Sequence, residues 1–210
     1  MTLIKQALSL LSEHRKAYIG MNVLYYGLIV CCMLLVTQNP SIQIELGKTV
    51  DQGLKTGFIA PVVKAYEEGN IPLAAALTFL VNLTLGSFGT ITLPSMVIPF
   101  SGLFMGCVRA VVWGLLFSPI TEESRTVFFP HILILVMEGQ AYILTMLTAW
   151  LHSKAFLFPE TVSETTHGRG FVAGFRLTGR LYVLIAIVLA VSAVCEALEI
   201  PFFEQLKGAL

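Results

Sequence analysis

Charged side chains are scarce in this sequence, and their scarcity excludes most soluble folds. Only 12% of the 210 residues are Asp, Glu, Lys or Arg, against roughly 25% in soluble domains. Hydrophobic residues make up 56% of the chain, and the mean hydropathy is +0.80. Basic and acidic residues both number 13, so no basic excess indicates nucleic acid as a partner. The composition predicts a membrane protein, with membrane lipid as its first partner.

Cysteine is also rare, and its four copies form no metal or redox motif. Cys31, Cys32, Cys107 and Cys195 lie within apolar runs, without CxxC or Cys/His spacing. We interpret them as small apolar side chains, and we predict no metal site and no cofactor.

Signatures of catalysis are missing as well. The zinc-protease motif HExxH is absent, since Glu138 follows His131 by seven positions, and neither a GxSxG turn nor paired transmembrane aspartates occur. The sequence therefore predicts no catalytic residues and no enzymatic activity.

The sequence does contain five apolar runs, each close to the roughly 20 residues that cross a bilayer. They cover 18–36, 71–93, 94–117, 127–152 and 181–199. Only Pro94 and Pro99 interrupt the second and third runs, so a re-entrant hairpin is an alternative to two full spans there. We predict an all-α polytopic membrane protein with about five transmembrane helices, forming a single membrane domain over 1–210.

Two further segments are amphipathic rather than continuously apolar. Residues 1–17 and the segment 40–70 each place apolar side chains at helical spacing beside charged ones. We expect an interfacial helix before the first span and an amphipathic segment on the opposite side. Either one packs at the interface or docks a partner protein.

Lysine and arginine in the short flanks indicate the orientation. If the N-terminus is inside, seven basic residues lie inside and five outside. The inner ones are Lys5, Arg15, Lys16, Lys154, Arg169, Arg176 and Arg180, and the outer ones are Lys48, Lys55, Lys64, Arg125 and Lys207. The count favours a cytoplasmic N-terminus in a prokaryotic plasma or inner membrane.

A stripe of small residues follows the third run at successive i+4 positions. Its members are Gly102, Gly106, Ala110 and Gly114. Helices in lipid associate largely through close backbone approach at small residues. We predict that this stripe packs against a neighbouring helix, either within the chain or in a homodimer.

Polar residues form a second stripe along the fourth run. His131, Glu138, Thr145 and His152 recur every seven residues and share one helix face. An ionisable group at the bilayer centre costs roughly 3 kcal/mol on insertion scales, so this face must point into the protein.

Other polar groups inside the apolar runs are Asn82, Arg109 and Glu196. At a rise of about 1.5 Å per residue, Arg109 lies about 12 Å and Glu138 about 16 Å below the outer boundary. The same count gives about 6 Å for His131 and about 5 Å for Glu196. We predict a buried polar cluster in two layers, Arg109 with Glu138 and His131 with Glu196. It either neutralises charge and fixes helix packing or forms a proton or ion path.

The chain resembles the stage II sporulation protein M family of integral membrane proteins over most of its length. The resemblance rests on Phe79 and Asn82 in "FLVNLTLGSFG", Gly102 and Gly106 in "PFSGLFMGC", Pro130–His131 at the start of a span, and "EALEIP" at Glu196–Pro201. His131 and Glu196 match family positions, whereas Glu138 lies three residues beyond the family's glutamate.

This resemblance implies a non-enzymatic scaffold or assembly subunit for cell-envelope proteins, whose partners are other envelope or membrane proteins. The alternative is a small ion- or proton-coupled transporter or channel subunit that uses the buried Arg/Glu/His cluster. A transporter needs Glu138 to be accessible to water from at least one side, whereas a scaffold has no such requirement.

Overall fold

Two long antiparallel helices form the axis of the molecule. The computed structural model describes residues 2–57 and 59–209, and the side chains at 51, 54–56, 122–123, 126–127, 130 and 200–209 lie outside the description, including those of Pro130 and Pro201. Helices α8 (Glu122–Leu157) and α9 (His167–Ala209) run side by side, joined through the short helix η2 (Pro159–Val162). They share the most extensive contact in the fold.

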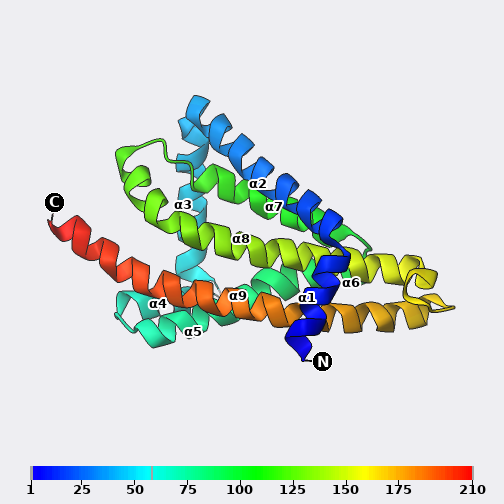
Figure 1. The fold of residues 1–210 in the computed structure, drawn as a ribbon. Helices are drawn as coiled ribbons and strands as arrows, with labels where there is room; N and C mark the ends of the chain where they lie inside the picture. Colours follow the sequence, from blue (N-terminus) through cyan, green and yellow to red (C-terminus); the bar gives the residue numbers. More distant parts are fainter. Residues whose placement is uncertain (1, 58, 210) are drawn as a thin grey trace.

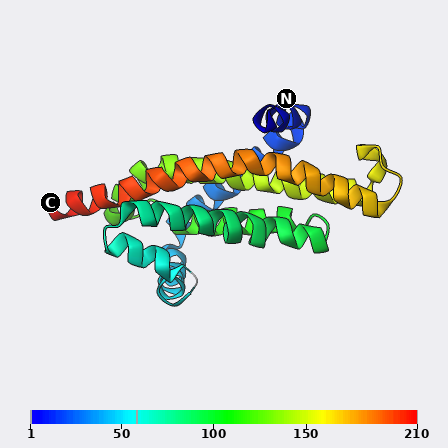
Figure 2. The ribbon, with the colours of Figure 1, turned by 90° about the horizontal axis from the view of Figure 1, so that it is seen from below.

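The other helices pack around this pair. They are α1 (Leu3–Glu13), α2 (Arg15–Gln38), α3 (Pro40–Thr56), α4 (Ala60–Glu67), α5 (Ile71–Val81), η1 (Asn82–Thr92), α6 (Leu93–Val97) and α7 (Ser101–Leu116). Both α1 and α3 run across the long axis of α8 and α9 (Figure 1), and they lie on opposite broad faces of the molecule (Figure 2). We refer to the end with the α8–α9 turn as the α1 end, and to the opposite end as the α3 end.

The predicted fold class is confirmed, because the described residues form an all-helical polytopic membrane protein. Four helical stretches are long and apolar enough to cross a membrane, namely 15–38, 71–97, 131–157 and 167–199. The third predicted span is shorter: α7 has 16 residues, or about 24 Å against a hydrocarbon thickness of about 30 Å.

Two predicted boundaries were wrong. The second run continues through Pro94 to Val97, because η1 leads directly into α6 at Leu93 and the chain stays helical past the proline. The chain instead turns at Phe100, whose φ is +67°. The last helix begins at His167 rather than at 181, and its first turns pack against the end of α8, where the ring of Phe171 meets that of His152.

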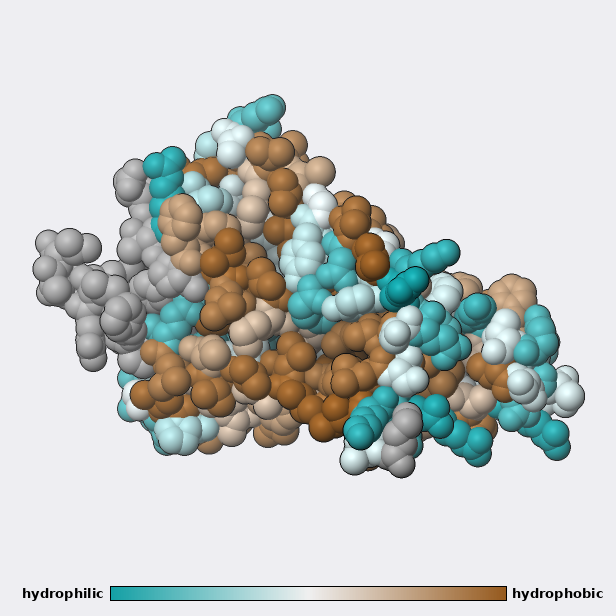
Figure 3. All heavy atoms as spheres, in the orientation of Figure 1, coloured by the Kyte–Doolittle hydropathy of each residue, from teal (hydrophilic) through white to brown (hydrophobic). Residues whose placement is uncertain are grey.

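Burial is unevenly shared among the candidate spans. Most of the apolar stretch of α8 is buried, whereas the other three spans keep most of theirs at the surface. Hydrophobic side chains cover much of the middle of the face in Figure 3, and hydrophilic ones gather toward the α8–α9 turn. Such a band suits contact with lipid.

The small-residue stripe of α7 is covered by the chain's own helices. Gly102, Gly106, Ala110 and Gly114 are all buried. A Cβ on Gly106 would meet Met146 of α8, and one on Gly114 would lie 2.5 Å from the carbonyl oxygen of Ile29 in α2. The stripe therefore packs within the molecule, and a homodimer would need another surface.

Substitution at Gly114 tests this close approach. Gly114→Ala should lower the free energy of unfolding by about 1–3 kcal/mol, because the backbone of α2 must move. Gly27→Ala is the matched control, since nothing lies within 4 Å of a Cβ there. Thermal unfolding in detergent should separate the two variants, and equal stability would mean that α2 and α7 do not meet at this point.

Candidate functional site

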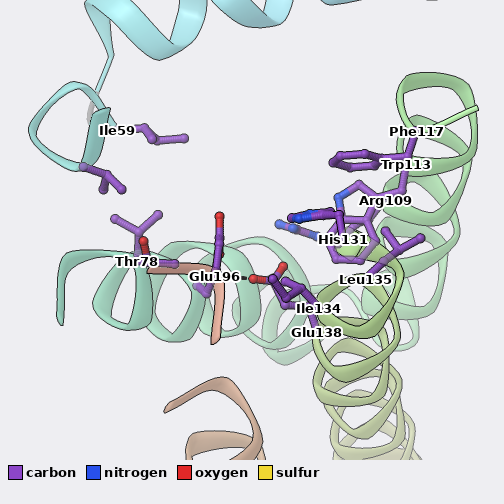
Figure 4. Close-up of a pocket in the computed structure, with 13 residues that line it drawn as sticks. Ile59, Thr78, Arg109, Trp113, Phe117, His131, Ile134, Leu135, Glu138 and Glu196 are labelled. Carbon is purple, nitrogen blue, oxygen red and sulfur yellow. Dashed lines mark hydrogen bonds between the residues drawn. The ribbon is translucent and has the colours of Figure 1, made fainter. Parts of the chain in front are cut away.

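All five residues of the predicted polar cluster line one cavity toward the α3 end. The cavity has a volume of about 220 Å³, is partly open, and is bordered by Asn82, Arg109, His131, Glu138 and Glu196. Helices η1, α7, α8 and α9 contribute these side chains (Figure 4). Ile59 and Val62, beside and within α4, line the cavity as well. A space of this size holds several water molecules.

Glu138 lies at the centre of the hydrogen bonding in the cavity. Glu138 is 7% exposed, and its Oε1 accepts a 2.7 Å hydrogen bond from Nδ2 of Asn82. The carboxyl of Glu196 borders the same cavity and lies beside that of Glu138 in Figure 4. Ionised carboxylates only accept hydrogen bonds, so a hydrogen bond between these two side chains requires a proton on one of them.

Arg109 lies in the same cavity but forms no ion pair with Glu138 among the described contacts. Its guanidinium carbon is instead 4.0 Å from the centre of the Tyr142 ring, a cation–π geometry. Gly86 of η1 leaves space there, since a Cβ would come within 3.0 Å of the Tyr142 hydroxyl and 3.4 Å of an Arg109 nitrogen. Arg109 therefore supplies positive charge to the cavity without touching Glu138.

The side chains of the cluster do not form the two predicted pairs. Nδ1 of His131 lies 3.4 Å from Oε1 of Glu199, and the imidazole stacks on Phe117 at 5.2 Å. Glu196, the expected partner of His131, contacts Glu138 instead. The predicted depth of Glu196 rests on a last span that ends at Glu199, whereas α9 continues to Ala209.

The remaining members of the polar stripe lie away from the cavity. Thr145 is fully buried and donates a 2.8 Å hydrogen bond to the carbonyl of Ala141. His152 is 1% exposed, and its ring meets that of Phe171 edge-on at 4.6 Å. The stripe does point into the protein, but only its first two members share a site.

Sequence reasoning missed a polar network between α2 and α8. The Gln140 amide donates hydrogen bonds to Asn22 Oδ1 at 2.8 Å and to the Tyr26 hydroxyl at 2.9 Å, and it accepts one from Tyr18. Tyr18, Asn22 and Tyr26 recur every four residues in a span that is otherwise apolar. That spacing is the signal that could have identified them.

A tyrosine of α4 completes the surroundings of the carboxyl pair. The hydroxyl of Tyr66 lies 3.1 Å from Oγ1 of Thr78, which borders the cavity. Burial, and then the nearby Glu196, raise the pKa of Tyr66 to about 12. Its phenol therefore stays neutral at physiological pH and keeps a proton for this hydrogen bond.

These features define a polytopic membrane protein in which two carboxyl side chains share a cavity with Asn82, Arg109 and His131. No family model, curated protein or solved structure matches the chain. Within the described part of the chain, no group of three or more His, Cys, Asp or Glu side chains is placed to hold a metal ion.

The Asn82–Glu138 hydrogen bond can be tested by a double-mutant cycle. Asn82→Leu should lower the free energy of unfolding by about 1–3 kcal/mol, since it removes a donor from a buried acceptor. Adding Glu138→Leu should recover part of this loss, which is the sign of a direct contact. Thermal unfolding monitored by tryptophan fluorescence suits the measurement, because Trp113 lines the cavity.

The control is Thr84→Val in the same helix. Thr84 is exposed and bonds only to the carbonyl of Leu80 in the preceding turn, so its removal should change stability little. Additive losses from Asn82→Leu and Glu138→Leu would contradict the contact.

Proposed function

We propose that this protein is a small, non-enzymatic membrane subunit that binds and moves a proton or small cation through the cavity beside Glu138. The two neighbouring carboxyls of Glu138 and Glu196 in one cavity carry this proposal. The pair borders a partly open space large enough for water, so Glu138 meets the requirement of access from one side.

Both members of the pair are carboxyls, which supports a role in binding a proton or cation over a role in holding the helices together. A structural pair would join opposite charges, and Arg109 borders the same cavity, yet the group beside Glu138 is another carboxyl. Two carboxyls in contact cannot both ionise without strong repulsion. Loss of the shared proton thus changes the charge of the cavity by one unit, and a small cation can take the proton's place.

We further propose that the protein spans a prokaryotic plasma or inner membrane with its N-terminus in the cytoplasm. Of the basic residues assigned to the inside, Arg169, Arg176 and Arg180 are exposed at the α1 end of α9. An excess of Lys and Arg is typical of the cytoplasmic side. The α3 end, with the cavity, then faces outward.

A second candidate function is that of a scaffold for envelope proteins. In helix α3, Glu45, Lys48 and Thr49 are exposed together with Ile44, whereas Leu46 and Val50 are partly buried, so the exposed face is free to meet an outer partner. The resemblance to the stage II sporulation protein M family supports this alternative. Co-purification of one defined envelope partner, lost on substitution of that face, would favour it.

Proton movement in liposomes tests the principal proposal. Protein reconstituted with an entrapped pH-sensitive dye should acidify or alkalise the lumen under a potassium diffusion potential faster than empty liposomes. Glu138→Gln and Glu196→Gln should each reduce that rate to background, because neither amide can release a proton. Repeating the assay with a sodium gradient tests whether the protein moves a small cation instead of a proton.

The matched control is Glu160→Gln, which alters an exposed carboxyl at the α8–α9 turn and should leave the rate unchanged. Wild-type protein that moves neither protons nor sodium, although it is folded and inserted, would overturn the proposal in favour of the scaffold.

A further inference from the structure

A third acidic residue, carried by α9, lies next to the carboxyl pair. Glu199 follows Glu196 by three positions on α9, about one turn further on, so both side chains project on the same side. On α8, His131 precedes Glu138 by two turns. Two pairs of neighbouring side chains link α8 and α9. One pair is Glu138 with Glu196, and the other is His131 with Glu199.

Exposure rises along these contacts toward the α3 end. Glu138 is 7% exposed, whereas Glu196, Glu199 and His131 are all partly exposed, the side chains of the last two by 12% and 20%. His131 also borders the cavity. Water therefore reaches these three groups more readily than it reaches Glu138.

Toward the α1 end, the same helices offer no comparable groups. Residues 141–149 of α8 are buried without interruption. The next ionisable group other than tyrosine on α8 is His152, about 21 Å along the helix from Glu138. Between Arg180 and Glu196, α9 carries no carboxylate, histidine, lysine or arginine.

Resting on the function proposed above, we propose that the Glu138–Glu196 pair exchanges its proton with the outer side by way of Glu199 and His131. The proton passes from the Glu196 carboxyl to the Glu199 carboxylate, and from there to the His131 imidazole, which releases it to water. Each donor is left in its unprotonated form, and the return path reverses these steps.

Other groups around the path set its electrostatic surroundings. Arg109 on α7 supplies positive charge, and Asn82 on η1 holds Glu138 by its amide. The titratable phenols nearby are those of Tyr25 on α2, Tyr66 on α4 and Tyr142 on α8. None of these phenols connects the pair to the α1 end.

Carbodiimide labelling tests the route, because carbodiimides react with protonated carboxyls buried in membranes. Full-length protein is placed in vesicles whose inner and outer pH are stepped separately, and a membrane-permeant carbodiimide is added. Mass spectrometry then follows labelling of Glu138 and Glu196. Single cysteines introduced as Ser41→Cys and Thr165→Cys, in a chain without the four native cysteines, report which side faces outward.

Labelling should follow the pH of the side on which Ser41→Cys reacts with an impermeant thiol reagent. Glu199→Gln and His131→Phe should each slow that response about tenfold or more, since a proton-transfer group is lost. Glu45→Gln, an exposed carboxyl on the same side, should not. Labelling that follows the other side, or that responds equally fast in both relay variants, would overturn the proposal.

This assay separates the route from the function on which it rests. Labelling reports protonation of the pair without requiring transport, whereas the liposome assay reports net movement. Failure of the liposome assay alone would reject transport, and failure of sided labelling alone would reject the Glu199–His131 route.

Discussion

The close approach of the Glu138 and Glu196 carboxyls is the constraint on which the arrangement of the site depends. It joins the central helix α8 to α9 at the level where Asn82 and Arg109 also enter the cavity. Two carboxylates at this position would repel each other inside a low-dielectric region, so a proton has to accompany folding. Packing and protonation are therefore linked in this part of the molecule.

The glycines of α7 and η1 make that arrangement sterically feasible. Gly106 and Gly114 allow α7 to approach α8 and α2, and Gly86 leaves room for Arg109 over the Tyr142 ring. Larger side chains at these positions would push apart the helices that surround the cavity. The small residues thus fix where the charged groups lie, although they carry no charge themselves.

The class of protein was predictable from composition, and the helical period indicated five of the polar side chains that border the cavity, but not Glu199, which lies beside His131. Long apolar runs predicted the helices, and the cost of exposing Glu138 to lipid predicted that it faces inward. The pairing within the cluster was not predictable. It depends on where α9 ends and on the direction of the Arg109 side chain, and both are decided by tertiary packing rather than by residue spacing.

Infrared spectroscopy of the purified protein addresses the shared proton most directly. A protonated carboxyl has its own carbonyl stretching band, distinct from that of a carboxylate. The account predicts such a band at neutral pH in the wild type, and its loss or clear weakening in both Glu138→Gln and Glu196→Gln, because the amide replaces the protonated partner and the remaining carboxyl ionises. A wild-type spectrum without the band, or an unchanged band in either variant, would contradict it.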